Sequence, residues 1–333
     1  MRVRSIYIWD RLNVCQILLS ACLTLLVFTG VYGQREPQYT QYMYNIGSFN
    51  PAYIGSVDKA DISLLYRSQW IDIPGAPRTL RLGVNIPMKN ERHGIGLNIV
   101  SDELGPSSQT YVDLGYSFQV RLSGETKLAF GLDAGGSFLN VDFSEGTFEN
   151  PGEPILDAEI IKNFYATIGA GLFMYGDDWY IGTSVPNFLT DDLYNAEVAT
   201  IVEDKLQFNF IGGVVFDLNE NLKFKPAFLV NLISGAPATF NASANFLFSD
   251  AFTAGVSYRA DNAISGLAGL KISNAVYIGY AYDYATTALA DYSSGSHEVI
   301  LKFYLGSGDP DSGSSKSKSK KGKGKQIDTP RFF

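Results

Sequence analysis

Residues 109–139 show the clearest pattern of apolar and polar positions in the chain. The two kinds of side chain alternate from Gln109 to Leu122, and the alternation resumes from Thr126 to Phe138. A period of two is typical of a β-strand with one apolar and one polar face. Between the two runs, Ser123-Gly124-Glu125 supplies the glycine of a tight turn. The pattern predicts a long β-hairpin whose strands, at about 13 residues, exceed the usual length in soluble sheets.

The same alternation begins at Ala60 and continues almost unbroken to Leu305. It favours strands over helices throughout, and it predicts fourteen strands, at residues 60–70, 78–87, 94–101, 109–122, 126–139, 163–175, 178–185, 205–217, 222–232, 239–248, 252–259, 263–272, 276–284 and 296–305. One face of these strands is Leu, Ile, Val, Phe and Ala, and the other is polar. A soluble β-sandwich turns such apolar faces inward, whereas a membrane barrel turns them outward to lipid. Alternation alone leaves both folds open.

The lengths of the connections distinguish the two folds. Connections after even-numbered strands are short, as at Ser123–Glu125 and Gly176-Asp177. Those after odd-numbered strands include the longest, at Asn140–Lys162, Pro186–Asp204 and Ala285–Gly295. Short turns at one end and long loops at the other, with an even number of strands, are typical of outer-membrane barrels.

Aromatic side chains near the predicted strand ends agree with this interpretation, because they suit the membrane interfaces. They are Trp70, Tyr111, Trp179, Tyr180, Tyr282, Tyr284 and Tyr304. A closed barrel also pairs every backbone group that lipid would leave unpaired. The sequence therefore predicts an all-β fold: a transmembrane antiparallel β-barrel of about 14 strands, with short periplasmic turns and longer extracellular loops.

The two ends of the chain differ from this body. Arg2, Arg4 and Arg11 precede the apolar run Gln16–Phe28, which predicts a secretory signal peptide cleaved after Gly33. A retained anchor helix and a lipoprotein signal that ends at Cys22 are the alternatives. Both cysteines lie in this segment, so the mature chain has no disulfide to form. The predicted organisation is a signal peptide (1–33), a mature N-terminal segment without clear period (34–58), an outer-membrane barrel (59–306) and a tail (307–333).

Charge is unevenly distributed along the chain. The net charge is −8, although residues 307–333 are rich in lysine, so the predicted barrel itself is acidic. An acidic body argues against a nucleic-acid partner. The Gly/Ser/Lys-rich tail lacks the apolar surface that a folded core needs, which predicts disorder. The tail is either simply solvated or an electrostatic contact for an anionic partner, and both mature termini are expected in the periplasm.

The sequence carries little that points to catalysis. Gly94-Ile-Gly96 lies within an alternating strand and therefore lacks the helix that a dinucleotide-binding fingerprint requires. There is no nucleophile elbow. His297-Glu298, near a predicted strand mouth, is either an acid–base pair or a polar pair on the rim. We expect a protein that is not an enzyme and that has no cofactor and no small-molecule substrate.

Two predicted extracellular loops are rich in carboxylates. Their acidic residues include Asp142, Glu145, Glu149, Glu153, Asp157, Asp191 and Asp192. Carboxylate oxygens are the ligands that Ca²⁺ prefers, but no loop has the regular ligand spacing of a calcium motif. Solvated acidic loops are therefore favoured over a calcium site, and their length suggests binding outside the cell.

Several short motifs, taken in order, resemble one family. They are Gln38-Tyr-Thr-Gln-Tyr-Met-Tyr-Asn45, Asn50-Pro-Ala-Tyr-Ile-Gly-Ser56, Tyr66-Arg-Ser-Gln-Trp70, Gly75-Ala-Pro77, Gly94-Ile-Gly96, Ser101-Asp-Glu-Leu-Gly-Pro106, Lys127-Leu-Ala-Phe-Gly131, Val185-Pro-Asn187 and His297-Glu298. Together they are similar to the PorP/SprF family of type IX secretion system outer-membrane proteins, from about Gln34 to Leu305. The Lys-rich tail after Gly306 departs from that family.

The resemblance implies a non-enzymatic outer-membrane barrel that serves protein export. It implies other type IX secretion components as partners, together with secreted surface proteins such as adhesins, including those of gliding motility, and outer-membrane lipid around the barrel. The candidate docking residues are Asn50, Pro51, Tyr53, Tyr66, Arg67, Gln69, Trp70, Gly75 and Pro77. Barrel closure and loop shape are the alternative role for these residues.

Other functions remain open at this point. Fourteen strands can enclose a lumen, so a general diffusion porin is the main alternative. An outer-membrane hydrolase and a soluble β-sandwich are further alternatives. The sequence also leaves open whether residues 34–58 plug the lumen.

Overall fold

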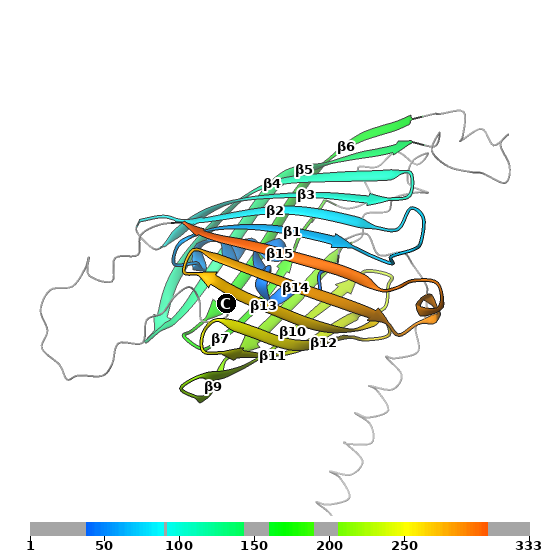
Figure 1. The fold of residues 1–333 in the computed structure, drawn as a ribbon. Helices are drawn as coiled ribbons and strands as arrows, with labels where there is room; N and C mark the ends of the chain where they lie inside the picture. Colours follow the sequence, from blue (N-terminus) through cyan, green and yellow to red (C-terminus); the bar gives the residue numbers. More distant parts are fainter. Residues whose placement is uncertain (1–37, 90–91, 143–159, 190–205, 306–333) are drawn as a thin grey trace, which may run out of the picture.

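The computed structural model describes residues 38–89, 92–142, 160–189 and 206–305, which form a β-barrel around a short N-terminal segment (Figure 1). Every strand pairs with its neighbours in antiparallel fashion, and the sheet closes where β1 pairs with β15 and β10 with β11. The strands are β1 (Ala60–Ser68), β2 (Arg78–Pro87), β3 (His93–Leu104), β4 (Ser107–Ser123), β5 (Thr126–Asp142), β6 (Ile160–Tyr175), β7 (Trp179–Val185), β8 (Gln207–Val214), β9 (Phe216–Asn219), β10 (Leu222–Ile233), β11 (Thr239–Phe248), β12 (Phe252–Arg259), β13 (Ala263–Ser273), β14 (Val276–Ala285) and β15 (Ser296–Leu305).

β8 and β9 are two parts of one strand. Both pair with β10, and the register is the same on either side of the break, as Gly213↔Ala227 and Phe216↔Phe224 show. Pro226 of β10 lies opposite the interruption. Proline has no backbone N–H to donate to a neighbouring strand, so the ladder is broken there. The barrel therefore has fourteen strands, and the prediction of a fourteen-stranded antiparallel barrel is confirmed.

The two faces of the wall are sorted as a membrane barrel requires. Apolar side chains point outward, and Leu114 and Leu132, for example, are 67% and 62% exposed. Polar side chains point into the lumen, where Arg67, Arg81 and Lys302 are almost completely buried. The apolar faces therefore meet lipid and the polar faces line the interior, which excludes the soluble sandwich. Among the described residues, no helix is both long and apolar enough to cross a membrane.

The predicted strand boundaries need small corrections. β1 ends at Ser68, so Trp70 lies in the following loop and not in the strand. β3 spans His93–Leu104, one residue earlier and three residues later than the predicted strand at 94–101. β5 ends at Asp142 and β6 begins at Ile160, so each strand is three residues longer than predicted. The parity of short turns and longer loops is as predicted.

The N-terminal segment lies inside the barrel. Residues 38–57, which we call the plug, form three short 3₁₀-helices, η1 (Tyr42–Tyr44), η2 (Ile46–Ser48) and η3 (Pro51–Ser56), drawn in blue within the strands in Figure 1. Nearly all of these residues are buried. Asn50 caps η3 by accepting from the Ala52 amide at 2.9 Å, and Pro51 occupies the first helical position, where a missing N–H costs nothing. The question left open by the sequence is thereby answered: the plug occupies the lumen.

Several predictions lie outside the described residues. They concern the signal peptide (1–33), the tail (307–333) and the acidic residues Glu145, Glu149, Glu153, Asp157, Asp191 and Asp192. Asp142 is described, at the end of β5, where its backbone N–H donates to the Pro106 carbonyl at 2.9 Å.

Candidate functional site

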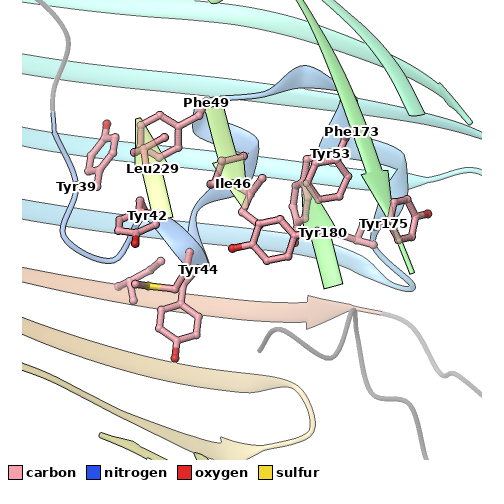
Figure 2. Packing of buried hydrophobic residues seen from close by; sticks show 14 of the residues in the cluster. Tyr39, Tyr42, Tyr44, Ile46, Phe49, Tyr53, Phe173, Tyr175, Tyr180 and Leu229 are labelled. Carbon is pink, nitrogen blue, oxygen red and sulfur yellow. The ribbon is translucent and has the colours of Figure 1, made fainter. Parts of the chain in front are cut away.

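An aromatic core joins the plug to the barrel wall (Figure 2). Tyr53 of η3 meets Phe173 of β6 edge to face, with ring centroids 5.6 Å apart, and Phe173 in turn packs against Tyr180 of β7 at 5.7 Å. Nearer the start of the plug, Tyr39 meets Phe49 at 5.7 Å. Such pairs contribute about 0.5–1.5 kcal/mol each beyond the apolar area that they bury. Burial also raises the pKa of the Tyr39 hydroxyl above its ordinary value, so it stays neutral.

A buried group of charges holds the beginning of the plug. Arg67 of β1 donates to Asp283 of β14 at 2.7 Å and to Glu298 of β15 at 3.1 Å. The Glu298 carboxylate also accepts the backbone N–H groups of Thr40 and Gln41, each at 2.8 Å. The desolvation free energy of these buried charges is offset because each has a partner of opposite sign and further hydrogen bonds. The same carboxylate thus joins two strands of the wall to the plug.

A second group holds the plug one helix further on. Lys302 of β15 forms an ion pair with Asp61 of β1 at 2.9 Å and donates to the Tyr44 carbonyl at 3.1 Å. Arg81 of β2 donates to the side chain of Asn45 at the end of η1. The bond from Lys302 satisfies a backbone carbonyl at the end of η1, where the short helix supplies no partner.

Asn50 holds the plug to the opposite side of the barrel. Its side-chain amide donates to the carbonyls of Leu172 on β6 at 2.9 Å and of Thr183 on β7 at 3.2 Å. These two residues face each other across the β6–β7 pair. Ser184 of β7 also donates to the Phe49 carbonyl. Asn50 therefore bridges two neighbouring strands from inside the lumen.

Two glycines of the wall make room for this close approach. A Cβ on Gly131 of β5 would overlap the backbone of Pro51 and Ala52, and one on Gly171 of β6 would overlap the Asn50 side chain. Only glycine lets the plug backbone lie this close to the strands. Glycines of the wall, as well as the residues of the plug, therefore determine where the plug lies.

The loop between β1 and β2 is held in a fixed conformation at the end of the barrel that carries the longer connections. Trp70 and Asp72 have positive φ of 48° and 78°, which is uncommon for residues other than glycine, and Gly75 has φ of 71°. Residues 69–77, which we call the rim loop, are tied to the loop before β15, because Ile71 N donates to Gly295 O at 2.9 Å. Gly105 N, in the β3–β4 turn, donates to Gly75 O at 2.9 Å. Strained residues held by such contacts are typical of functional sites.

The candidate docking residues fall in two places. Asn50, Pro51 and Tyr53 belong to the plug, whereas Gln69, Trp70, Gly75 and Pro77 belong to the rim loop. Arg67 points into the lumen as an anchor of the plug, and its neighbour Tyr66 points outward with 47% of its surface exposed. The structure therefore does not bring these residues together into one site. Sequence reasoning did not identify Thr40, Gln41, Asp61 and Asp283 as partners, although the polar lumen faces of the strands were recognised.

The pair His297-Glu298 needs a correction. Adjacent residues of a strand point to opposite faces, and here Glu298 is completely buried in the lumen while His297 lies outside, against Tyr280 of β14. The two side chains form neither an acid–base pair nor a polar pair on the rim. Within the described ranges, no cluster of three His, Cys, Asp or Glu side chains has the arrangement of a metal site.

The chain is similar to the solved structures of a FadL homologue from Pseudomonas aeruginosa (12% identity, 82% of this chain and 95% of that chain covered, TM-score 0.43) and of the CymD monoaromatic hydrocarbon channel (12% identity, 82% and 95% covered, TM-score 0.48). No curated protein matches it. The family model described as type IX secretion system membrane protein PorP/SprF matches residues 31–303.

Proposed function

The chain belongs to the PorP/SprF family of type IX secretion system membrane proteins, and from that premise we propose that it supports the secretion or cell-surface attachment of specific large proteins, such as adhesins. It is an outer-membrane barrel of that secretion system. The proposal adds that it works without enzymatic activity, that its signal peptide directs export, and that both mature termini lie in the periplasm. Its partners are the other secretion components and the exported proteins themselves, with gliding motility among the processes served.

The observation that carries this proposal is the plug. A diffusion porin needs a water-filled lumen, and here the lumen holds a buried segment fixed by Arg67, Glu298 and Asn50. A barrel whose interior is occupied offers partners its outer surfaces. We therefore favour a role in contacting proteins over a role in general diffusion.

The rim loop is the surface best suited to such contacts. Its backbone is fixed by hydrogen bonds to two neighbouring loops, so binding a partner costs little further ordering of the chain. It carries Trp70, and aromatic residues of this kind are frequent anchors in protein interfaces. The loop lies at the end of the barrel where the longer connections gather, which in the proposed orientation faces the outside of the cell.

The deciding experiment compares the surface and medium proteins of a wild-type strain with those of a strain in which this gene is deleted. We expect one or a few large surface proteins to be lost from the surface, and the full-length gene to restore them. Loss of every type IX substrate would make the protein a general part of the machine instead. Unchanged display of all surface proteins, in a strain that has no second copy of the family, would reject the proposal.

A second experiment addresses the porin alternative. The purified full-length barrel is placed in planar lipid bilayers and its conductance is recorded. We expect no steady conductance, because the plug occupies the lumen. Stable, discrete channels from the unaltered protein would favour the porin.

A further inference from the structure

The outer wall has a groove over β5, β6 and β7. It is a hollow of about 520 Å³, and its lining includes Ala170, Leu172, Thr183 and Val185. The strand register explains its shape, because one row across the wall pairs Tyr116 with Leu132, Leu132 with Ala170 and Ala170 with Val185, and Phe208 of β8 lines the far side. Small side chains in the middle of this row are flanked by large ones on both sides. The groove therefore follows from the order of side-chain sizes in the sequence.

The groove lies over a weak part of the wall. β7 is the shortest strand of the described barrel apart from β9, which continues β8. β6 spans Ile160–Tyr175 but pairs with β7 only from Ala170 to Tyr175. A short ladder has fewer backbone hydrogen bonds and fewer cross-strand side-chain contacts to hold it. Like the β7–β8 seam, which is equally short, this seam is thus less well supported by the sheet itself than the β5–β6 seam beside it.

The same seam is supported from the lumen by the plug. Asn50 donates to Leu172 O and Thr183 O on the inner side, and the outer side chains of these two residues line the groove. At these two residues, the plug contacts the backbone from the lumen and the groove lies on the other side of the same strands. Because the outer side is hollow, the seam lacks on the membrane side the packing that the plug gives it inside.

We propose that this groove binds an acyl chain of a membrane phospholipid, which packs over the β6–β7 seam. The groove belongs to the lipid-facing wall, since Leu132, Leu172 and Phe208 around it are all exposed on the outside of the barrel. Its walls are mainly hydrocarbon side chains, and the hydroxyl group of Tyr116 is engaged by His93. An acyl chain that fills the groove makes dispersion contacts with side chains that would otherwise line a void. This inference does not depend on which proteins the barrel helps to export.

The test uses the full-length barrel in native outer-membrane vesicles and in liposomes, with a phosphatidylethanolamine that carries a photoreactive diazirine on its acyl chain as the probe. After illumination, labelled peptides are mapped by mass spectrometry. We expect labelling of the peptides around Leu132, Leu172 and Phe208 to exceed that of the wall formed by β11–β14 several-fold. Equal labelling around the whole barrel would overturn the proposal, because it would show only the surrounding bilayer.

A matched pair of variants makes the test specific. Ala170→Phe fills the groove, and Ala268→Phe adds the same ring on the outward face of β13, away from it. We expect Ala170→Phe to reduce labelling to the level of the rest of the wall and Ala268→Phe to leave the pattern unchanged. If Ala170→Phe fails to assemble, judged by heat-dependent migration in gels, Ala170→Leu serves instead. Unchanged labelling in the filled variant, or groove labelling seen in liposomes and absent from native membranes, would overturn the proposal.

Discussion

Arg67 and Glu298 are direct neighbours across the pair of strands that closes the barrel, and their side chains meet in the lumen at 3.1 Å. Glu298 at the same time binds the backbone of Thr40 and Gln41 in the plug. The strand pair that closes the barrel and the plug therefore share one carboxylate. The plug and β1 at the beginning of the described residues are thus joined to β15 at their end.

Replacing Arg67 by leucine should destabilise the barrel by about 3–5 kcal/mol, because Asp283 and Glu298 would remain buried without their main cation. Unfolding in urea in the presence of lipid vesicles measures the loss. The control is Lys223→Met, which breaks the exposed ion pair with Asp250 and should cost at most about 1 kcal/mol. Equal effects of the two substitutions would show that Arg67 is not an anchor.

A side chain at Gly131 should expel the plug. Gly131→Val places a branched side chain where the backbone of Pro51 and Ala52 lies. Gly266→Val is the control, because a Cβ there meets nothing within 4 Å. We expect Gly131→Val to expose the plug to added protease and to open the barrel to ion flow in planar bilayers, while Gly266→Val behaves as the unaltered protein. A protected plug in Gly131→Val would contradict the packing described here.

The barrel could be predicted from local sequence, because each strand repeats the same two-residue period and each turn carries its own signal. The plug could not, because its conformation depends on partners far along the chain. Thr40 and Glu298, for example, are 258 residues apart. Residues 38–57 have no period, and their 3₁₀-helices are too short to be stable alone.

Trp70 and the pair His297-Glu298 show two further limits. The pattern of residue types continues through Trp70, but its positive φ ends the strand before it, and backbone conformation of this kind has no signature in residue type outside glycine and asparagine or aspartate. His297 and Glu298 are adjacent in sequence, yet the strand separates them. The alternation along residues 296–305 puts Glu298 on the polar face of that strand and His297 on the other, so reading the two as a pair overlooked the pattern itself.

Strongly alkaline solution should loosen the plug before it unfolds the barrel wall. Burial raises the pKa of Tyr39, Tyr42 and Tyr53 above the ordinary value of 10.0. A group whose pKa is raised by folding contributes stability below its unfolded pKa and loses it as the pH rises, so above about pH 10 ionisation favours the displaced plug. Tyrosinate absorbance and protease cleavage of the plug should rise together as the pH is increased. Full tyrosine ionisation with the plug still protected would contradict this.

Loss of the Asn50 side chain should weaken the β6–β7 seam more than other seams. Asn50→Ala removes two hydrogen bonds to that seam, each of which contributes about 0.5–1.5 kcal/mol. Hydrogen exchange followed by mass spectrometry should show faster exchange in peptides of β6 and β7, with β13 and β14 of the same sample as the internal reference. A uniform increase in exchange around the barrel would mean that Asn50 supports the fold generally and not this seam.

A single substitution tests the role of the rim loop independently of the stability of the barrel. Asp72 has a positive φ and accepts a hydrogen bond from Ser294 in the loop before β15, so Asp72→Gly removes that bond while keeping a residue that tolerates the conformation. Asp261→Gly is the control, because Asp261 also has a positive φ and lies in a connection at the same end of the barrel. Neither change touches the plug or the lumen charges, so both variants should fold with stabilities within about 0.5 kcal/mol of the unaltered protein, as is usual for surface substitutions. If the rim loop contacts the exported proteins, Asp72→Gly should reduce their display on the cell surface and Asp261→Gly should not. Normal display in the Asp72→Gly strain, with equal amounts of barrel in the membrane, would move the partner contact away from the rim loop.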